Sequence, residues 1–154
     1  MKDEQPEHPD VAITEDVWGP PLEDLARRRP TIRCPDAWRD IEQMSDVLKH
    51  VRALVVRNRT RVDKTLMACC PNLRIVARAG VGLDNIDVAA ANEAGIVVVA
   101  PAGANARSVA EHAIGLALAL CRRTVSLDAE CRRGNWSRLA GRELQGAIWG
   151  MLGA

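Results

Sequence analysis

Short apolar runs without polar alternation divide the chain into predicted strands, each followed by a stretch with helical spacing. The clearest run extends from Leu73 to Ala77, and another extends from Ile96 to Ala100. Continuous apolar runs of this length are typical of strands buried on both faces of a parallel sheet. Further strands are predicted over residues 11–14, 31–34 and 53–56.

The segments between the strands carry apolar residues at helical spacing, with capping residues, proline or glycine at their ends. Asp36 or Asp40 can cap one helix, and Gly95 can close another. The predicted helices cover residues 20–29, 41–48, 62–70 and 88–95. Because strand and helix alternate five times, we predict an α/β fold of the flavodoxin-like class, a parallel sheet with helices on both faces.

The longest helical segment begins directly after Ser108. Ser108 and Glu111 have the S-x-x-E spacing of a capping box. We predict one helix from Val109 to about Arg133, on the order of 37 Å long at about 1.5 Å per residue. Residues 110–120 are apolar on nearly every side, so this long helix should be buried all round.

Composition limits the class of protein. The chain has 154 residues, 47% of them hydrophobic and 27% charged, which is ordinary for one soluble domain with a sizeable core. A formal net charge of +1 argues against an electrostatic nucleic-acid binder. No apolar run reaches the roughly 20 residues that span a bilayer, and residues 1–10 form a charged leader that we predict to be disordered and not a signal peptide. We therefore expect a cytoplasmic protein that binds no membrane.

Cysteine usage agrees with a reducing compartment. The sequence has 5 cysteines, an odd number, with no C-x-x-C spacing. Reduced thiols fit this pattern better than disulfides or a metal site, and we expect no metal.

Polar residues at the ends of predicted strands are candidates for ligand binding, since open α/β sheets bind ligands at the carboxyl ends of their strands. Gly80 and Gly82 flank Val81 directly after one strand, so the backbone there can approach a ligand and offer N–H groups to an anion. Asn105 follows another strand, and Arg57 follows a third.

Two motifs, in order along the chain, resemble those of a known family. The first is Arg-Ala-Gly-Val-Gly-Leu-Asp-Asn-Ile-Asp at residues 78–87, and the second is Gly-Ala-Asn-Ala-Arg-Ser-Val-Ala-Glu-His at residues 103–112. Together they resemble the NAD-dependent D-2-hydroxyacid dehydrogenases, most closely the phosphoglycerate dehydrogenase branch. The resemblance extends from about Val11 to the last residue and is most specific between Val55 and Gly146.

The resemblance implies a portion of an oxidoreductase in three parts. These are a substrate-binding domain over residues 11–105, a long interdomain and dimerisation helix with its turn over 106–146, and the first strand of a nucleotide-binding domain over 147–154. The family's His general acid/base, its carboxylate partner and a substrate-binding Arg would all lie beyond residue 154. No catalytic residue is expected within this chain, and we expect the chain alone to be inactive.

The resemblance also implies a substrate half-site. The cofactor would be NAD, contacted by Val81, Val109 and Gly153, the last as the first glycine of GxGxxG. The substrate would be a small anionic 2-hydroxy or 2-oxo acid, and the two arginines favour 3-phosphoglycerate. The partner would be a second copy, in a homodimer formed through the long helix. The implied substrate-binding residues are Arg57, Arg78, Val81, Gly82 and Asn105.

Simpler interpretations of the same residues stay open. The two glycines could serve only a tight turn, and Asn105 could be a local cap. The two arginines could be surface residues paired with Asp84 or Asp87. At the level of function, the alternative is a non-catalytic module that binds small carboxylates or dimerises. A phosphoacceptor receiver domain is disfavoured, because the chain lacks a clear cluster of paired acids after its first strand and a lysine after its last.

Overall fold

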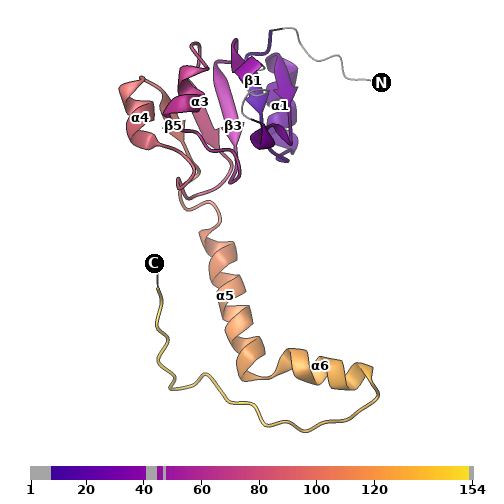
Figure 1. Ribbon diagram of the computed structural model, residues 1–154. Helices are drawn as coiled ribbons and strands as arrows, with labels where there is room; N and C mark the ends of the chain where they lie inside the picture. Colours follow the sequence, from indigo (N-terminus) through magenta and orange to yellow (C-terminus); the bar gives the residue numbers. More distant parts are fainter. Residues whose placement is uncertain (1–7, 41–44, 47, 153–154) are drawn as a thin grey trace. The chain divides into compact units, whose positions relative to one another are not determined.

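The computed structural model describes residues 8–40, 45–46 and 48–152. The chain forms two compact units, residues 1–103 and residues 104–154 (Figure 1). Among the described residues, no helix is long and apolar enough to cross a membrane.

A five-stranded parallel sheet forms the centre of the first unit, and its strand order is β2-β1-β3-β4-β5. This is the flavodoxin-like order, so the predicted fold class is confirmed. The strands are shorter by one or two residues than the apolar runs that predicted them, apart from β3. Their bounds are Val11–Ile13 (β1), Thr31–Arg33 (β2), Ala53–Val56 (β3), Ile75–Arg78 (β4) and Val97–Val99 (β5).

Helices cover both faces of the sheet, as predicted (Figure 1). On one face, Leu22 and Leu25 of α1 (Pro20–Arg28) pack against a small cluster that includes Ile13. On the other face, the main core contains Leu66 of α3 (Lys64–Ala68) and Ala91 of α4 (Val88–Glu93). Alternate residues of β1 and β3 point into the two clusters, which explains why these strands are apolar throughout.

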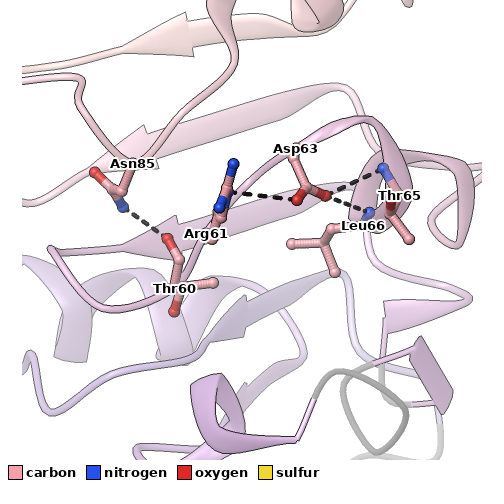
Figure 2. A network of polar contacts seen from close by, with 6 residues as sticks. All are labelled: Thr60, Arg61, Asp63, Thr65, Leu66 and Asn85. Atoms are coloured by element: carbon pink, nitrogen blue, oxygen red, sulfur yellow. Dashed lines mark hydrogen bonds and ion pairs between the residues drawn. The ribbon is translucent and has the colours of Figure 1, made fainter.

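Aspartates cap two of these helices. The Asp63 side chain accepts hydrogen bonds from the backbone N–H groups of Thr65 and Leu66, both at 3.1 Å (Figure 2). Asp87 accepts from the N–H of Ala90 at 2.9 Å, and α4 ends before Gly95, whose φ of +68° suits glycine. Gly95 therefore closes this helix as predicted, whereas α3 starts after its aspartate cap and is shorter than the predicted range 62–70.

The helix predicted over residues 41–48 falls mostly outside the described residues. Before it, Ala37–Arg39 forms a short 3-10 helix, η1, after Asp36. The Asp36 side chain makes no capping hydrogen bond there.

The prediction of one helix from Val109 to about Arg133 is wrong. The second unit has two helices, α5 (Ala106–Cys121) and α6 (Thr124–Arg132), separated by Arg123 in the left-handed conformation with φ of 53°. Helix propensity does not explain the break, because Arg122 and Arg123 are good helix formers and the β-branched Thr124 and Val125 lie inside α6. The helix also begins three residues early, so Ser108 lies inside it and the predicted capping box does not form.

The expected burial of this segment is also absent within the chain. Apolar side chains of α5 are exposed, with Leu116 at 53% and Leu120 at 79%. Residues 147–152 form no strand, and Ile148 is fully exposed. A strand needs a hydrogen-bonding neighbour, and the described part of the second unit offers none. The assignment of residues 147–154 to a nucleotide-binding domain stays a prediction.

Candidate functional site

The carboxyl ends of three neighbouring strands bring the candidate residues of the first unit together. Thr14 and Glu15 follow β1, the segment 57–60 follows β3, and the segment 79–82 follows β4. Because β3 lies between β1 and β4 in a parallel sheet, these three connections lie side by side at one edge. This edge is where the fold class binds its ligands.

Glu15 organises the connection after β3. Its carboxylate is 3% exposed and accepts backbone N–H bonds from four consecutive residues at 2.8–3.0 Å: Arg57, Asn58, Arg59 and Thr60. Burial raises the pKa of the Glu15 carboxyl, but the four donors outweigh burial and hold the pKa below its ordinary value. Glu15 is therefore an internal anion that fixes the path of residues 57–60 at neutral pH.

Arg78, the last residue of β4, is held by two acceptors. Its Nε lies 2.8 Å from the carbonyl oxygen of Arg57 and 3.0 Å from Oδ1 of Asn85. Asn85 in turn donates from Nδ2 to the carbonyl oxygen of Thr60 at 2.7 Å (Figure 2). The Arg78 side chain thus joins the connection after β3 to the turn after β4.

The glycine turn lies against the Arg78 guanidinium. A Cβ atom at Gly80 would lie 3.0 Å from Nη1 of Arg78, and one at Gly82 would lie 3.5 Å from the same atom and 3.0 Å from Oδ2 of Asp84. Neither glycine has a left-handed φ, so their role is the close approach of the turn to the side chains of Arg78 and Asp84 and not the backbone conformation.

The backbone of this turn has free donors. Within the described residues, the N–H groups of Gly80, Val81 and Gly82 have no acceptor. Val81 is 42% exposed, so the turn faces solvent. Three unpaired N–H groups beside a guanidinium form a site that can bind a carboxylate or another oxyanion.

Arg57 offers a second cation at the same edge. Together with neighbouring residues it borders a pocket of about 300 Å³. No salt bridge joins Arg57 or Arg78 to an acid in the described part of the chain. The alternative in which both arginines pair with Asp84 or Asp87 is therefore not what the structure has. The pocket is lined by Glu15, Asp16, Pro35, Arg57, Asn58 and Arg59.

The remaining predicted site residues belong to the second unit or are not described. Asn105 precedes α5 and makes no capping hydrogen bond through its side chain. Val109, on α5, is 56% exposed. Gly153 lies outside the described residues. The structure therefore brings together Arg57, Arg78, Val81 and Gly82, all in the first unit.

Glu15 and Asn85 are the site residues that sequence reasoning missed. Glu15 contacts residues more than 40 positions away, so no local spacing reveals its partners. The available signal was an acidic residue directly after a buried strand. Asn85 belongs to a quoted motif, but its role depends on a neighbouring strand connection.

The described residues also include the side chain types that most often bind metals. They contain no group of three or more His, Cys, Asp or Glu side chains that could hold an ion. All 5 cysteines are free thiols. Burial raises the pKa of Cys70 to about 11, so this thiol stays protonated and unreactive at neutral pH.

Known proteins include a family that matches most of this chain and several with similar sequences. Residues 11–149 match the family described as D-isomer specific 2-hydroxyacid dehydrogenase, catalytic domain. The sequence is 45% identical over 114 residues to D-3-phosphoglycerate dehydrogenase of Archaeoglobus fulgidus, a match that covers 73% of this chain and 21% of that protein. It is 42% identical over 114 residues to hydroxypyruvate reductase of Thermotoga maritima, covering 73% of this chain and 37% of that protein.

Solved structures agree with the fold. NAD-dependent formate dehydrogenase of Staphylococcus aureus, solved in complex with NAD, superposes with a TM-score of 0.66 at 26% identity, over 82% of this chain and 42% of that one. The chain thus spans less than half the length of these relatives.

Proposed function

The chain belongs to the D-isomer specific 2-hydroxyacid dehydrogenase family, and we propose that it supplies the substrate half-site of an NAD-dependent oxidoreductase. The substrate would be a small anionic D-2-hydroxy acid, with 3-phosphoglycerate as the first candidate. One observation carries this proposal: the unpaired N–H groups of residues 80–82 lie beside the Arg78 guanidinium at the carboxyl edge of the sheet.

The geometry supports a division of labour between the two cations. The substrate carboxylate would accept hydrogen bonds from the N–H groups of Val81 and Gly82 and from the terminal nitrogens of Arg78. Arg57, which has no ion pair among the described residues, would face the second anionic group of the substrate. A monocarboxylate would leave Arg57 without a partner, and this favours a substrate such as 3-phosphoglycerate over one with a single charge.

NAD would supply the hydride acceptor when bound. Val81 would contact its nicotinamide end, and Val109, in the second unit, is proposed separately as a cofactor contact. None of the described residues forms a glycine-rich turn that leads from a strand directly into a helix. None of the described histidines is hydrogen-bonded to a carboxylate. The part of the described residues in the reaction is therefore to bind and orient the substrate anion. No hydride or proton transfer is assigned to them.

Titration of the purified chain with 3-phosphoglycerate tests this half-site. We expect weak binding by calorimetry, with a Kd on the order of 1 mM, and no heat with NAD. The Gly82→Trp variant should abolish the phosphoglycerate signal, because a side chain at this position would meet Arg78 and Asp84 and fill the turn. The unmodified chain should also show no NAD-dependent oxidation of phosphoglycerate.

A matched control is Gly150→Trp, since a Cβ at Gly150 meets no atom within 4 Å. This control should bind phosphoglycerate as the unmodified chain does. Equal binding by the Gly82→Trp variant would place the site elsewhere, and silence of the unmodified chain with phosphoglycerate would refute a half-site that works alone. Turnover by the unmodified chain would contradict the proposal that this chain only binds and orients the substrate anion.

We also propose dimerisation through α5 as a second function, in the second unit. The helix is mostly apolar, yet Val109, Ile114, Leu116, Leu118 and Leu120 are each 46% exposed or more. Large exposed apolar surfaces on a helix mark interaction sites, because burial stabilises by about 25 cal/mol per Å². A second copy of the same helix could cover this surface.

Sedimentation velocity tests dimerisation. The unmodified chain should sediment as a dimer, and the double variant Ile114→Glu with Leu118→Glu should sediment as a monomer, because the two residues lie one turn apart on α5. The control, Ser108→Glu with His112→Glu, places two charges at polar positions with the same spacing and should remain dimeric. A monomeric unmodified chain would refute the proposal.

A further inference from the structure

Asn85 holds the Arg78 side chain in one direction. Of the three nitrogens of the guanidinium, Nε is occupied internally, with acceptors on Arg57 and Asn85 within 3.0 Å. The terminal nitrogens are left for other partners, and Nη1 lies beneath the glycine turn, as the close approaches at Gly80 and Gly82 show. The inward bond at Nε therefore decides where the two terminal nitrogens point.

Asn85 can do this because it is itself fixed. Its Nδ2 donates to the carbonyl oxygen of Thr60 at 2.7 Å, and its backbone carbonyl accepts from the N–H of Val62 at 2.8 Å. These partners also settle the amide orientation, since Arg78 Nε is a donor and needs Oδ1, whereas the Thr60 carbonyl is an acceptor and needs Nδ2. The side chain has no second arrangement that satisfies both neighbours.

Thr60 is anchored in turn by a buried polar pair. Its N–H donates to the Glu15 carboxylate at 2.9 Å, and its hydroxyl lies 2.8 Å from the hydroxyl of Thr14. Both Thr14 and Thr60 are 1% exposed. A continuous series of hydrogen bonds thus leads from the end of β1, through Thr60 and Asn85, to Arg78 at the end of β4.

We propose that Asn85 is a positioning residue for the anion site, and that its amide pre-orients the Arg78 guanidinium toward the glycine turn. This proposal rests on the proposed function, because it assigns the oriented guanidinium to the substrate anion. Without Asn85, the partly exposed Arg78 side chain keeps one acceptor and regains rotamer freedom, and a ligand must then restrict that freedom on binding. This loss of side-chain entropy on binding should weaken anion binding while the fold stays intact.

The direct test is NMR of the arginine Nε–H groups in the unmodified chain. We expect the Arg78 Nε–H to exchange with water at least tenfold more slowly than that of Arg74, which precedes the same strand and has no side-chain acceptor among the described residues. Equal exchange rates would overturn the proposal. This measurement needs no ligand and no variant.

The Asn85→Ala variant gives the second test, with Asn72→Ala as its control. Asn72 also donates from Nδ2 to a backbone carbonyl, that of Lys49 at 3.0 Å, but it lies away from the turn. In Asn85→Ala we expect at least tenfold faster exchange of the Arg78 Nε–H and about tenfold weaker phosphoglycerate binding, and in Asn72→Ala neither change. Circular dichroism of both variants should match the unmodified chain.

The outcomes separate this proposal from the proposed function. Unchanged exchange of Arg78 in a folded Asn85→Ala variant would overturn the positioning role, even if phosphoglycerate binds the unmodified chain. Slow exchange that is lost in Asn85→Ala, in a chain that binds no phosphoglycerate, would support the fixed guanidinium while the proposed function fails. If Asn85→Ala did not fold, the isosteric Asn85→Leu variant would take its place, and equal exchange of Arg78 and Arg74 in the unmodified chain would in any case overturn the proposal.

Discussion

The Glu15→Gln variant should lose about 3–5 kcal/mol of the free energy of unfolding. The Glu15 carboxylate accepts four backbone N–H bonds while only 3% exposed. Glutamine keeps one acceptor oxygen and turns an NH2 group toward the remaining N–H donors. Those donors would then lose their acceptor at a site that is buried at Thr60 and partly buried at the other three residues, each at a cost of up to about 1–3 kcal/mol. Urea denaturation followed by circular dichroism measures the loss.

Asp16→Asn is the matched control for this variant. It removes one negative charge at the next residue, which is exposed and makes no hydrogen bond or salt bridge within the described chain. Its effect should stay within about 0.5 kcal/mol. A loss below about 1 kcal/mol in Glu15→Gln would contradict the assignment of Glu15 as the anchor of residues 57–60.

Acid should erase the difference between Glu15→Gln and the unmodified chain. The pKa of Glu15 in the folded chain is lowered, so its carboxylate stabilises the fold fully above the ordinary glutamate pKa of about 4.3 and loses this contribution as the pH falls toward the folded pKa. The gap in stability between the two proteins should therefore be constant near neutral pH and shrink below about pH 4.

The sequence predicts the sheet well because burial on both faces leaves a local signal. β1, β3 and β5 are short runs without polar residues and β4 is apolar up to Arg78, whereas β2 has one apolar residue between Thr31 and Arg33. The alternation of strands with helical segments is sufficient to predict a parallel sheet. Asp87 and Gly95 mark the ends of α4 for the same reason, since a cap acts within one turn of its own position. The glycine turn after β4 was also visible as a motif.

Long-range partners are what the sequence does not reveal. Glu15 accepts from residues 42 to 45 positions away, and Asn85 donates to Thr60, 25 positions away, in both cases through backbone groups that every residue carries. The contact of Asn85 with Arg78 spans only 7 positions, but it joins two side chains across a turn. The sequence does not reveal the break at Arg123 because no glycine or proline interrupts the segment. Burial of α5 was inferred from its composition, but composition says only that an apolar surface needs a partner and not that the same chain provides one.

The Arg78→Met variant should weaken phosphoglycerate binding by roughly 30- to 150-fold, or about 2–3 kcal/mol. Methionine keeps the apolar stem but removes the charge and both terminal donors that lie beneath the glycine turn. The Arg78→Lys variant should bind phosphoglycerate with an affinity between those of the unmodified chain and Arg78→Met. An ammonium group restores the charge but not the planar fork that matches an oxyanion. Calorimetric titration of the three proteins measures the series.

Arg74→Met separates local recognition from net charge. Arg74 directly precedes β4, whereas Arg78 ends it, so the two substitutions remove the same charge from opposite ends of one strand. If the site lies at the carboxyl edge, Arg74→Met should change binding less than twofold, since charges separated by more than about 10 Å are screened at ordinary salt. Equal weakening by both variants would mean that phosphoglycerate responds to overall charge, and the anion would then have no specific site at the glycine turn.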